Sequence, residues 1–281
     1  MMSIQICYLE GGCGLFLSLL LYIFGCAAQD LSKEAQTHTI LLSSLDTIYA
    51  DNGVSEGFDL DNQITTPHDA SGCYQTDLID SSGREGIDNS YGTLQPFLGT
   101  SEIQDNGNAL LDGSTQQIIP ILIRISGVND QNNDEQVKVE AILGEGPLLF
   151  GTDGEFLDGQ TVAPDPEQPI VTAQHAYIEQ GVLHIEGFPF FNALLPGTFG
   201  STGAMRAQFN RGNIVQGLAG ASMPVEGMYA LYDDVSYTDF LNDHINRAAD
   251  MNPDENGFCQ EISSVYSFVS TSAHLLGEVV D

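Results

Sequence analysis

From residue 118 onward, apolar and polar residues alternate with the two-residue period of β-strands, and this pattern limits the fold class more than any other feature. The clearest example is PIVTAQHAYIEQGVLHIEG, residues 169–187, which predicts a hairpin with a two-residue turn at Gln180 and Gly181. The turn fixes three cross-strand pairs: Glu179 with Val182, Tyr177 with His184, and His175 with Glu186. The apolar phase changes between Ala173 and Ala176, which indicates a bulge in the first arm.

Other stretches extend the strand pattern. IIPILIRISGV (118–128) is rich in β-branched residues, and EQVKVEAIL (135–143) alternates. In the latter, Val137, Val139, Ala141 and Leu143 are expected to face inward, with Lys138 and Glu140 outward. A third hairpin is predicted over 203–223, turning at residues 210–213, and a closing strand over 259–272.

Short helices are predicted between the strands. They cover residues 88 or 89 to 98, 102–117, 224–235 and 239–250, the last capped by Thr238 or Asp239. Together the elements predict a mainly β fold, an antiparallel sheet or β-sandwich decorated with short α-helices. We expect one β-rich domain over residues 51–281.

The first 25 residues are typical of a signal peptide, because an uncharged run with an apolar core ends at Gly25. IFGC, residues 23–26, resembles a bacterial lipobox, which predicts lipidation of Cys26 and attachment to a membrane. Two alternatives stay open, secretory cleavage after Ala28 and an uncleaved anchor. Residues 26–50 are expected to form a polar tether.

The chain has five cysteines, three of them in the leader or at its end. Export to an oxidising compartment would leave Cys73 and Cys259 to form one disulfide. The alternative is two unrelated buried thiols.

Thirty-nine acidic residues against seven Lys and Arg give a net charge of −32 at pH 7. This charge repels nucleic acid and anionic lipid, and it favours cations or a basic partner. The acids are dispersed, which is typical of a folded acidic protein rather than a disordered tail.

Several loops carry oxygen-bearing side chains at alternate positions, the spacing with which calcium-binding loops present their ligands. They are Asn252, Asp254 and Asn256 before Gly257; Asp130, Asn132 and Asp134; and the pair Asp59 and Asp61. None completes an EF-hand, since Ser263 occupies the twelfth position of the first loop. Because Asp, Asn and Gly are also ordinary turn residues, calcium binding and simple turns both stay open.

The predicted hairpin register places His175, Tyr177, His184 and Glu186 on one face. Such a cluster could bind zinc or act in acid–base chemistry. The alternative is the solvent-facing side of an amphipathic sheet.

CYQTDLIDSSGREGIDNSYGTLQPFL (73–98), with the later stretches GPLLFGTDGEFLDGQT (146–161) and NPDENGFCQEIS (252–263), resembles a group of uncharacterised predicted lipoproteins from Gram-negative bacteria. The likeness spans roughly residues 55–270, and residues 86–89 with the two cysteines carry most of it. The resemblance implies export and a shared fold but no chemistry.

No nucleophile motif, HExxH or phosphate-binding loop is present in the sequence. We therefore predict a non-enzymatic exported envelope lipoprotein, a binding or structural module that calcium could stabilise. The alternative is a secreted, glycosidase-like hydrolase with a carboxylate pair that the sequence does not identify.

Overall fold

A strand of 17 residues, β12 (Cys259–Leu275), lies at the centre of the sheet. The computed structural model describes residues 35–70, 73–94, 120–189, 202–210, 213–231 and 238–277. The other strands are β1 (Gln36–Thr47), β2 (Ile121–Val128), β3 (Asn133–Asp134), β4 (Lys138–Glu145), β5 (Gln160–Pro164), β6 (Val171–Thr172), β7 (His175–Glu179), β8 (Val182–Glu186), β9 (Gly203–Asn210), β10 (Asn213–Pro224) and β11 (Met251–Pro253). The helices are the 3₁₀ turn η2 (Tyr91–Leu94), α4 (Val225–Leu231) and α5 (Thr238–Ala248).

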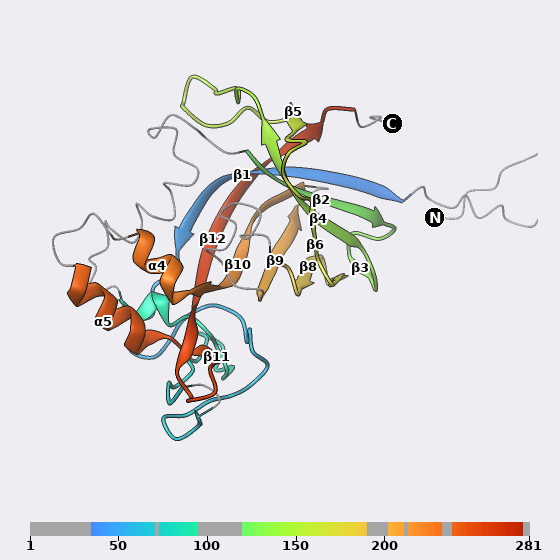
Figure 1. Cartoon of the computed structure of the whole chain (residues 1–281). Helices are drawn as coiled ribbons and strands as arrows, with labels where there is room; N and C mark the ends of the chain where they lie inside the picture. The colour runs from blue at the N-terminus through green and yellow to red at the C-terminus, as the bar shows by residue number, and fades with distance from the viewer. Residues whose placement is uncertain are drawn as a thin grey trace, which may run out of the picture. The chain divides into compact units, whose positions relative to one another are not determined.

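The strands form one mostly antiparallel sheet in the order β1-β2-β4-β5-β12-β10-β9-β8-β7-β3, with β5 parallel to β12 (Figure 1). β1 also pairs with β12, and β4 pairs with β6 in the segment that leads into β7. The pairing therefore runs full circle, from β1 through β2, β4, β6–β7, β8, β9, β10 and β12 back to β1. The mainly β class with short helices is confirmed, as one sheet whose ends meet rather than two separate sheets.

The sheet buries apolar side chains on both faces of β1, β2 and β4. Ile40, Ile123 and Val139 belong to the larger core, whereas Leu41, Leu122 and Ile142 belong to a smaller one on the opposite face. Burial on both faces explains why residues 118–128 read as a nearly continuous apolar run.

Glu140 was predicted to face solvent, and this is wrong. Its position alternates with Val139, so it points to the second face of β4, where it is only 5% exposed. Arg124 donates to Glu140 Oε2 at 2.9 and 2.7 Å, and Lys138 Nζ lies 2.7 Å from Oε1. The two cations compensate the buried carboxylate.

The predicted hairpin register is confirmed pair for pair, from Glu179 with Val182 to His175 with Glu186. Gln180 and Gly181 have φ of 52° and 78°, as a type I′ turn requires. The first arm is interrupted between β6 and β7, where the sequence indicated a bulge. The β9–β10 hairpin pairs Asn210 with Asn213, as predicted.

The tether predicted through residue 50 is wrong for residues 36–47, which form β1. Ile40, Leu41, Leu42 and Leu45 are at most 2% exposed, so this segment is a core strand despite its Ser and Thr content. Residues Glu34–Asp281 group into one unit by their contacts.

The segment 51–94, hereafter the loop layer, has little regular structure and covers part of the outer face of β10 and β12 (blue-green in Figure 1). A Cβ added to Gly220 would lie 2.6 Å from the Phe58 ring, and one added to Gly57 would lie 3.0 Å from Val265. Of the helix predicted from residue 88 or 89 to 98, the structure describes only η2, which ends at Leu94. The helix predicted over 102–117 lies outside the described residues.

Candidate functional site

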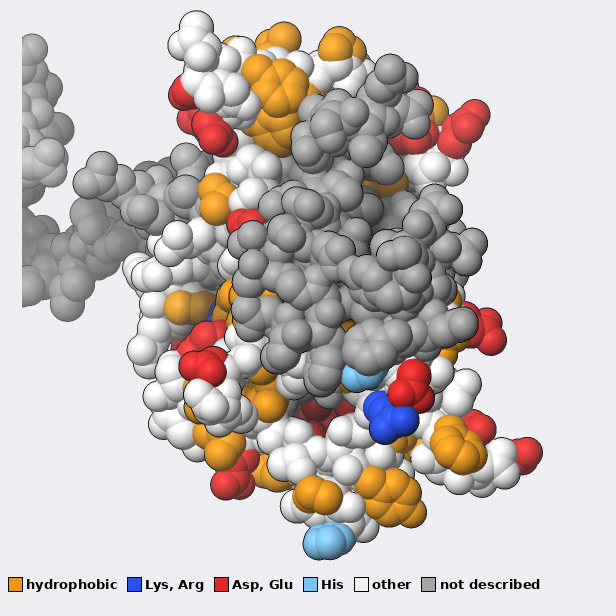
Figure 2. All heavy atoms as spheres, turned by 90° about the vertical axis from the view of Figure 1, so that its left-hand side faces the viewer, with side chains coloured by type: hydrophobic (Ala, Val, Ile, Leu, Met, Phe, Trp, Pro, Cys, Tyr) orange, Lys and Arg blue, Asp and Glu red, His pale blue; other side chains and the backbone are white. Residues whose placement is uncertain are grey.

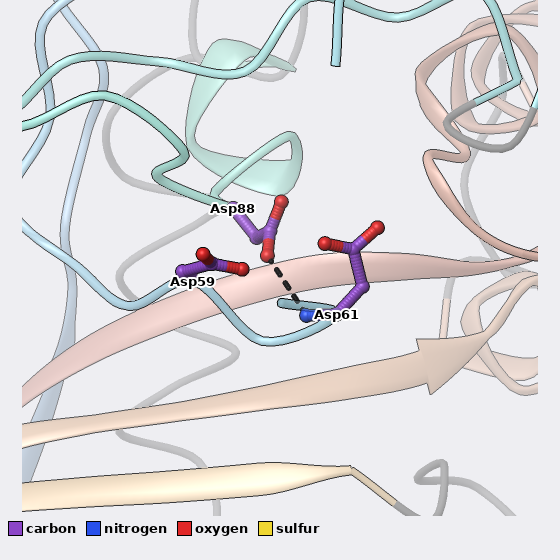
Figure 3. Close-up of side chains that lie close together, drawn as sticks. All are labelled: Asp59, Asp61 and Asp88. Atoms are coloured by element: carbon purple, nitrogen blue, oxygen red, sulfur yellow. Dashed lines mark hydrogen bonds between the residues drawn. The ribbon is translucent and has the colours of Figure 1, made fainter. Parts of the chain in front are cut away.

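Three carboxylates meet at the surface of the loop layer. One oxygen from each of Asp59, Asp61 and Asp88 lies within 4.8 Å of the other two, and the Asp88 carboxylate lies between the others in Figure 3. We call these residues the acidic triad. Within the described ranges, it is the one group of three or more His, Cys, Asp and Glu side chains close enough to share a metal ion.

Backbone amides hold the triad in place. Asp88 Oδ2 accepts from Leu60 N at 2.5 Å and from Asp61 N at 3.3 Å. Gln63 N donates to Asp59 Oδ1 at 3.1 Å and to Asp61 Oδ1 at 2.8 Å. Each carboxylate is therefore positioned by the tight turn at residues 59–63 rather than by a basic side chain.

The triad has little electrostatic compensation, because the Arg84 charge lowers the pKa of Asp59 but is outweighed by burial. Asp88 is 3% exposed, and burial, followed by the charges of Asp250 and Asp61, raises its pKa to about 9. Burial also raises the pKa values of Asp59 and Asp61, with a contribution from Asp77. The guanidinium of Arg84 is engaged elsewhere, donating to Asp80 at 3.0 Å and to the Gly57 carbonyl at 2.8 Å.

Such a set of oxygens could hold a metal ion. Carboxylates are the ligands of hard cations such as calcium and magnesium rather than of thiophilic metals. Asp59 is exposed, Asp61 is half-buried and Asp88 is buried, so the site has a protein side and a solvent side. An ion there could take its remaining ligands from water.

The triad adjoins the contact between the loop layer and β12. The side chain of Asn89, next to Asp88, accepts from Val265 N at 3.1 Å and donates to the Ile48 carbonyl at 2.9 Å. Ser90 of the loop layer donates its N–H to the hydroxyl of Ser263 in β12 at 2.9 Å. A ligand at Asp88 would therefore act on the attachment of the loop layer to the sheet.

The structure places the calcium loop predicted at Asn252, Asp254 and Asn256 in the turn between β11 and β12. Asp254 Oδ1 accepts from Asn256 N at 2.8 Å and from Phe258 N at 2.9 Å, and the first of these hydrogen bonds closes an Asx turn. Backbone hydrogen bonds, led by that from Phe258, lower the pKa of Asp254. Calcium binding here stays a prediction.

The second predicted loop also forms local hydrogen bonds. Asp134 Oδ2 accepts from Asn129 N at 2.7 Å, and Asp130 Oδ1 accepts from Asn132 N at 2.8 Å. Asp134 lies in the two-residue strand β3, and the other three residues precede that strand. A calcium site here likewise stays a prediction.

The predicted surface cluster is brought together. The rings of Tyr177 and His184 stack at 4.9 Å and 8°, His175 lies 5.2 Å from Tyr177, and His175 Nδ1 is 3.4 Å from Glu186 Oε2. Burial, followed by the charge of Arg206, lowers the pKa of His184. The arrangement is a cross-strand stack, and no chemistry follows from it alone.

The predicted disulfide between Cys73 and Cys259 is confirmed, with Cα atoms 5.7 Å apart. A disulfide indicates an oxidising, extracytoplasmic location. Among the described helices, none is long and apolar enough to cross a membrane. Cys26 lies outside the described residues.

No protein-family model, curated protein or solved structure matches this chain. Fold and site define it as a mainly β protein with a disulfide and an acidic triad that could hold a metal ion.

Sequence reasoning identified Asp59 and Asp61 as a pair but missed Asp88, which it considered, with Asn89 as the alternative, as the N-cap of a short helix. No local pattern marks Asp88 as their partner, because 27 residues separate it from Asp61.

Proposed function

We propose that the protein is an exported, non-enzymatic lipoprotein of the bacterial cell envelope, anchored in a membrane by a lipid on Cys26. Its β-rich domain is a binding or structural module that calcium stabilises at Asp59, Asp61 and Asp88. One observation carries the calcium site: a carboxylate that is 3% exposed faces two others, and no described basic side chain bonds to any of the three.

The distances are compatible with calcium. Two oxygens on opposite sides of a calcium ion are about 4.6–5.2 Å apart, since each lies about 2.3–2.6 Å from the ion. The triad oxygens lie within 4.8 Å of one another, so they can reach one ion without a change in the backbone. Magnesium requires shorter distances and near-ideal octahedral geometry, which an irregular loop does not supply.

The anchor is supported by the uncharged run that ends at Gly25 and by the disulfide, which is consistent with export. The negative charge disfavours nucleic acid as a partner and favours cations or a basic protein. Acidic side chains are dispersed over the described part of the face in Figure 2 rather than gathered in one patch. The hydrolase alternative has no observation in its favour.

The calcium site is tested by thermal unfolding of the full chain in EDTA, calcium or magnesium. Calcium at 100 times its dissociation constant should stabilise the fold by about 2.7 kcal/mol. Asp61→Asn should abolish most of this gain, whereas the matched variant Asp254→Asn should keep it, and magnesium should not reproduce it. Loss of the response in Asp254→Asn alone would move the site to the turn before β12. Absence of any response in the wild type would refute calcium binding.

The anchor is tested by mass spectrometry of the N-terminal peptide from the native host. A diacylglyceryl group on Cys26 is expected, and Cys26→Ser should release the protein from the membrane fraction. An unmodified peptide that begins at Gln29 would instead establish ordinary secretion.

A further inference from the structure

A groove of about 490 Å³ lies on the outer face of β8, β9, β10 and β12. Ala207 and Phe268 contribute backbone to it, while their side chains point into the core. The side chains of six residues give it its chemical character: Val182, Leu218, Val269, Gln208, Gln216 and Arg206. With Ser267 as a further lining residue, the groove is aliphatic with two amides, one hydroxyl and one cation, and no acidic residue lines it.

Arg206 is one of only seven Lys and Arg residues in a chain with a net charge of −32. Arg206 is 30% exposed, and its nearest acid is Glu56, with 3.9 Å between Arg206 Nη2 and Glu56 Oε2, beyond hydrogen-bonding distance. The Phe58 ring lies 5.7 Å from the guanidinium carbon, close enough for a cation–π contact. Arg206 makes no hydrogen bond through its guanidinium to any described residue.

The other described arginines differ. Arg84 donates to Asp80 and to a backbone carbonyl, and Arg124 donates twice to Glu140. Arg247 donates to Asp243 at 3.2 Å. A guanidinium has five N–H donors, so Arg206 alone among these four presents a nearly full set to a ligand.

The neighbouring side chains add no second positive charge. His184 pairs with Arg206 across β8 and β9, and burial together with the Arg206 charge lowers its pKa, so the imidazole is neutral at pH 7. At 3.9 Å and with a half-exposed side chain, Glu56 offsets the Arg206 charge only in part, so the guanidinium can still pair with one negative charge. A dianion would be undercompensated and repelled by the acidic protein, and a neutral ligand would leave a partly buried guanidinium without partners.

We propose that this groove binds an amphiphilic monocarboxylate, whose carboxylate pairs with Arg206 and whose aliphatic body packs on Val182, Leu218 and Val269. A carboxylate accepts two parallel N–H bonds from a guanidinium, which fixes its orientation. Gln208 and Gln216 supply hydrogen bonds to polar groups of the ligand. The site is independent of the acidic triad.

Octanoate is the probe for this proposal, used with the full disulfide-bonded chain in calorimetry and in ¹⁵N NMR. Octanoate should bind in the micromolar to millimolar range and shift the amides of β9 and β10. Octan-1-ol tests the aliphatic body without the charge, acetate tests the head group alone, and octyl phosphate tests a dianionic head. Each should bind at least tenfold more weakly than octanoate, because octanol loses the charged hydrogen bonds, acetate loses the aliphatic contacts, and octyl phosphate carries a second negative charge that the groove does not compensate.

Arg206→Gln should weaken octanoate binding about tenfold or more, whereas Arg247→Gln, a matched change at an exposed ion pair, should leave it unchanged. Val269→Asp places a carboxylate at a position that is 45% exposed, so it should block binding without disturbing the core. Equal affinity in Arg206→Gln and the wild type would overturn the proposal. Octanol or octyl phosphate binding as tightly as octanoate, or no amide shift in β9 and β10 at millimolar octanoate, would also overturn it.

Discussion

Replacing Asp88 by Asn should stabilise the cation-free protein and abolish its stabilisation by calcium. In the cation-free fold the pKa of Asp88 is raised from 3.8 to about 9, mainly by burial. Between these values the folded state binds more protons than the unfolded chain, so stability is lost as the pH rises from about 4 to 9. At pH 7 the loss amounts to roughly 4 kcal/mol, because each pKa unit corresponds to about 1.4 kcal/mol.

Asparagine does not titrate and can still accept the hydrogen bonds from Leu60 N and Asp61 N that Asp88 Oδ2 accepts. Asp88→Asn should therefore be about 1–4 kcal/mol more stable than the wild type in EDTA at pH 7, the lower figure allowing for weaker hydrogen bonds. At pH 4 the difference should largely disappear. In saturating calcium the wild type should gain about 2.7 kcal/mol or more, and the variant almost nothing.

Urea unfolding followed by circular dichroism measures these differences, since the chain has no Trp for a fluorescence signal. The matched control is Asp254→Asn, which removes an exposed carboxylate. This variant should gain as much stability from calcium as the wild type does. If Asp88→Asn is less stable than the wild type in EDTA at pH 7, the reasoning fails, because the carboxylate would then be needed for the fold itself.

Three further predictions concern the framework around the site. Replacing Cys73 and Cys259 by Ser should lower the free energy of unfolding by about 5 kcal/mol, because the disulfide closes a loop with a sequence separation of 186 residues. A loss below about 1 kcal/mol in urea unfolding would contradict this prediction. Burial raises the pKa of Asp250 from 3.8 to about 6, so stability should fall by about 3 kcal/mol between pH 4 and 6; Asp250→Asn should flatten this slope in urea titrations, and an unchanged slope would contradict the assignment. Gly220→Ala should lower the free energy of unfolding by about 1–3 kcal/mol, because the added Cβ would lie 2.6 Å from the Phe58 ring. Thermal unfolding measures this loss, and an unchanged melting temperature would show that the ring moves freely.

Hairpins were predictable because their register depends on neighbouring residues. A two-residue turn with positive φ at both positions fixes every pair that follows it, so Gln180 and Gly181 were enough to align β7 with β8. β1 was not predictable in the same way. Its partners β2 and β12 lie far along the chain, and its Ser and Thr residues suggested a polar linker.

Glu140 illustrates a second limit. Alternation along β4 separated its two faces correctly, but it could not indicate that the second face is covered as well. The residues that make Glu140 tolerable there, Arg124 and Lys138, show their role only once β2 and β4 are paired. A rule that assigns charged residues to solvent fails where a neighbouring strand supplies the opposite charge.

Asp88 shows why the candidate site could not be derived from the sequence. An acid before a short helix favours a cap, but Asn89 has that role, accepting from Gly92 N at 3.3 Å. The four hydrogen bonds of the Asn89 amide, to Gly92, Val265, Ile48 and Ser55, use its full capacity. Asp88 is therefore not needed as a cap. Its Oδ2 accepts two amides, while its Oδ1 accepts no hydrogen bond from any described residue. A carboxylate that is 3% exposed and faces two others is costly in the cation-free protein, and a bound cation would lower that cost.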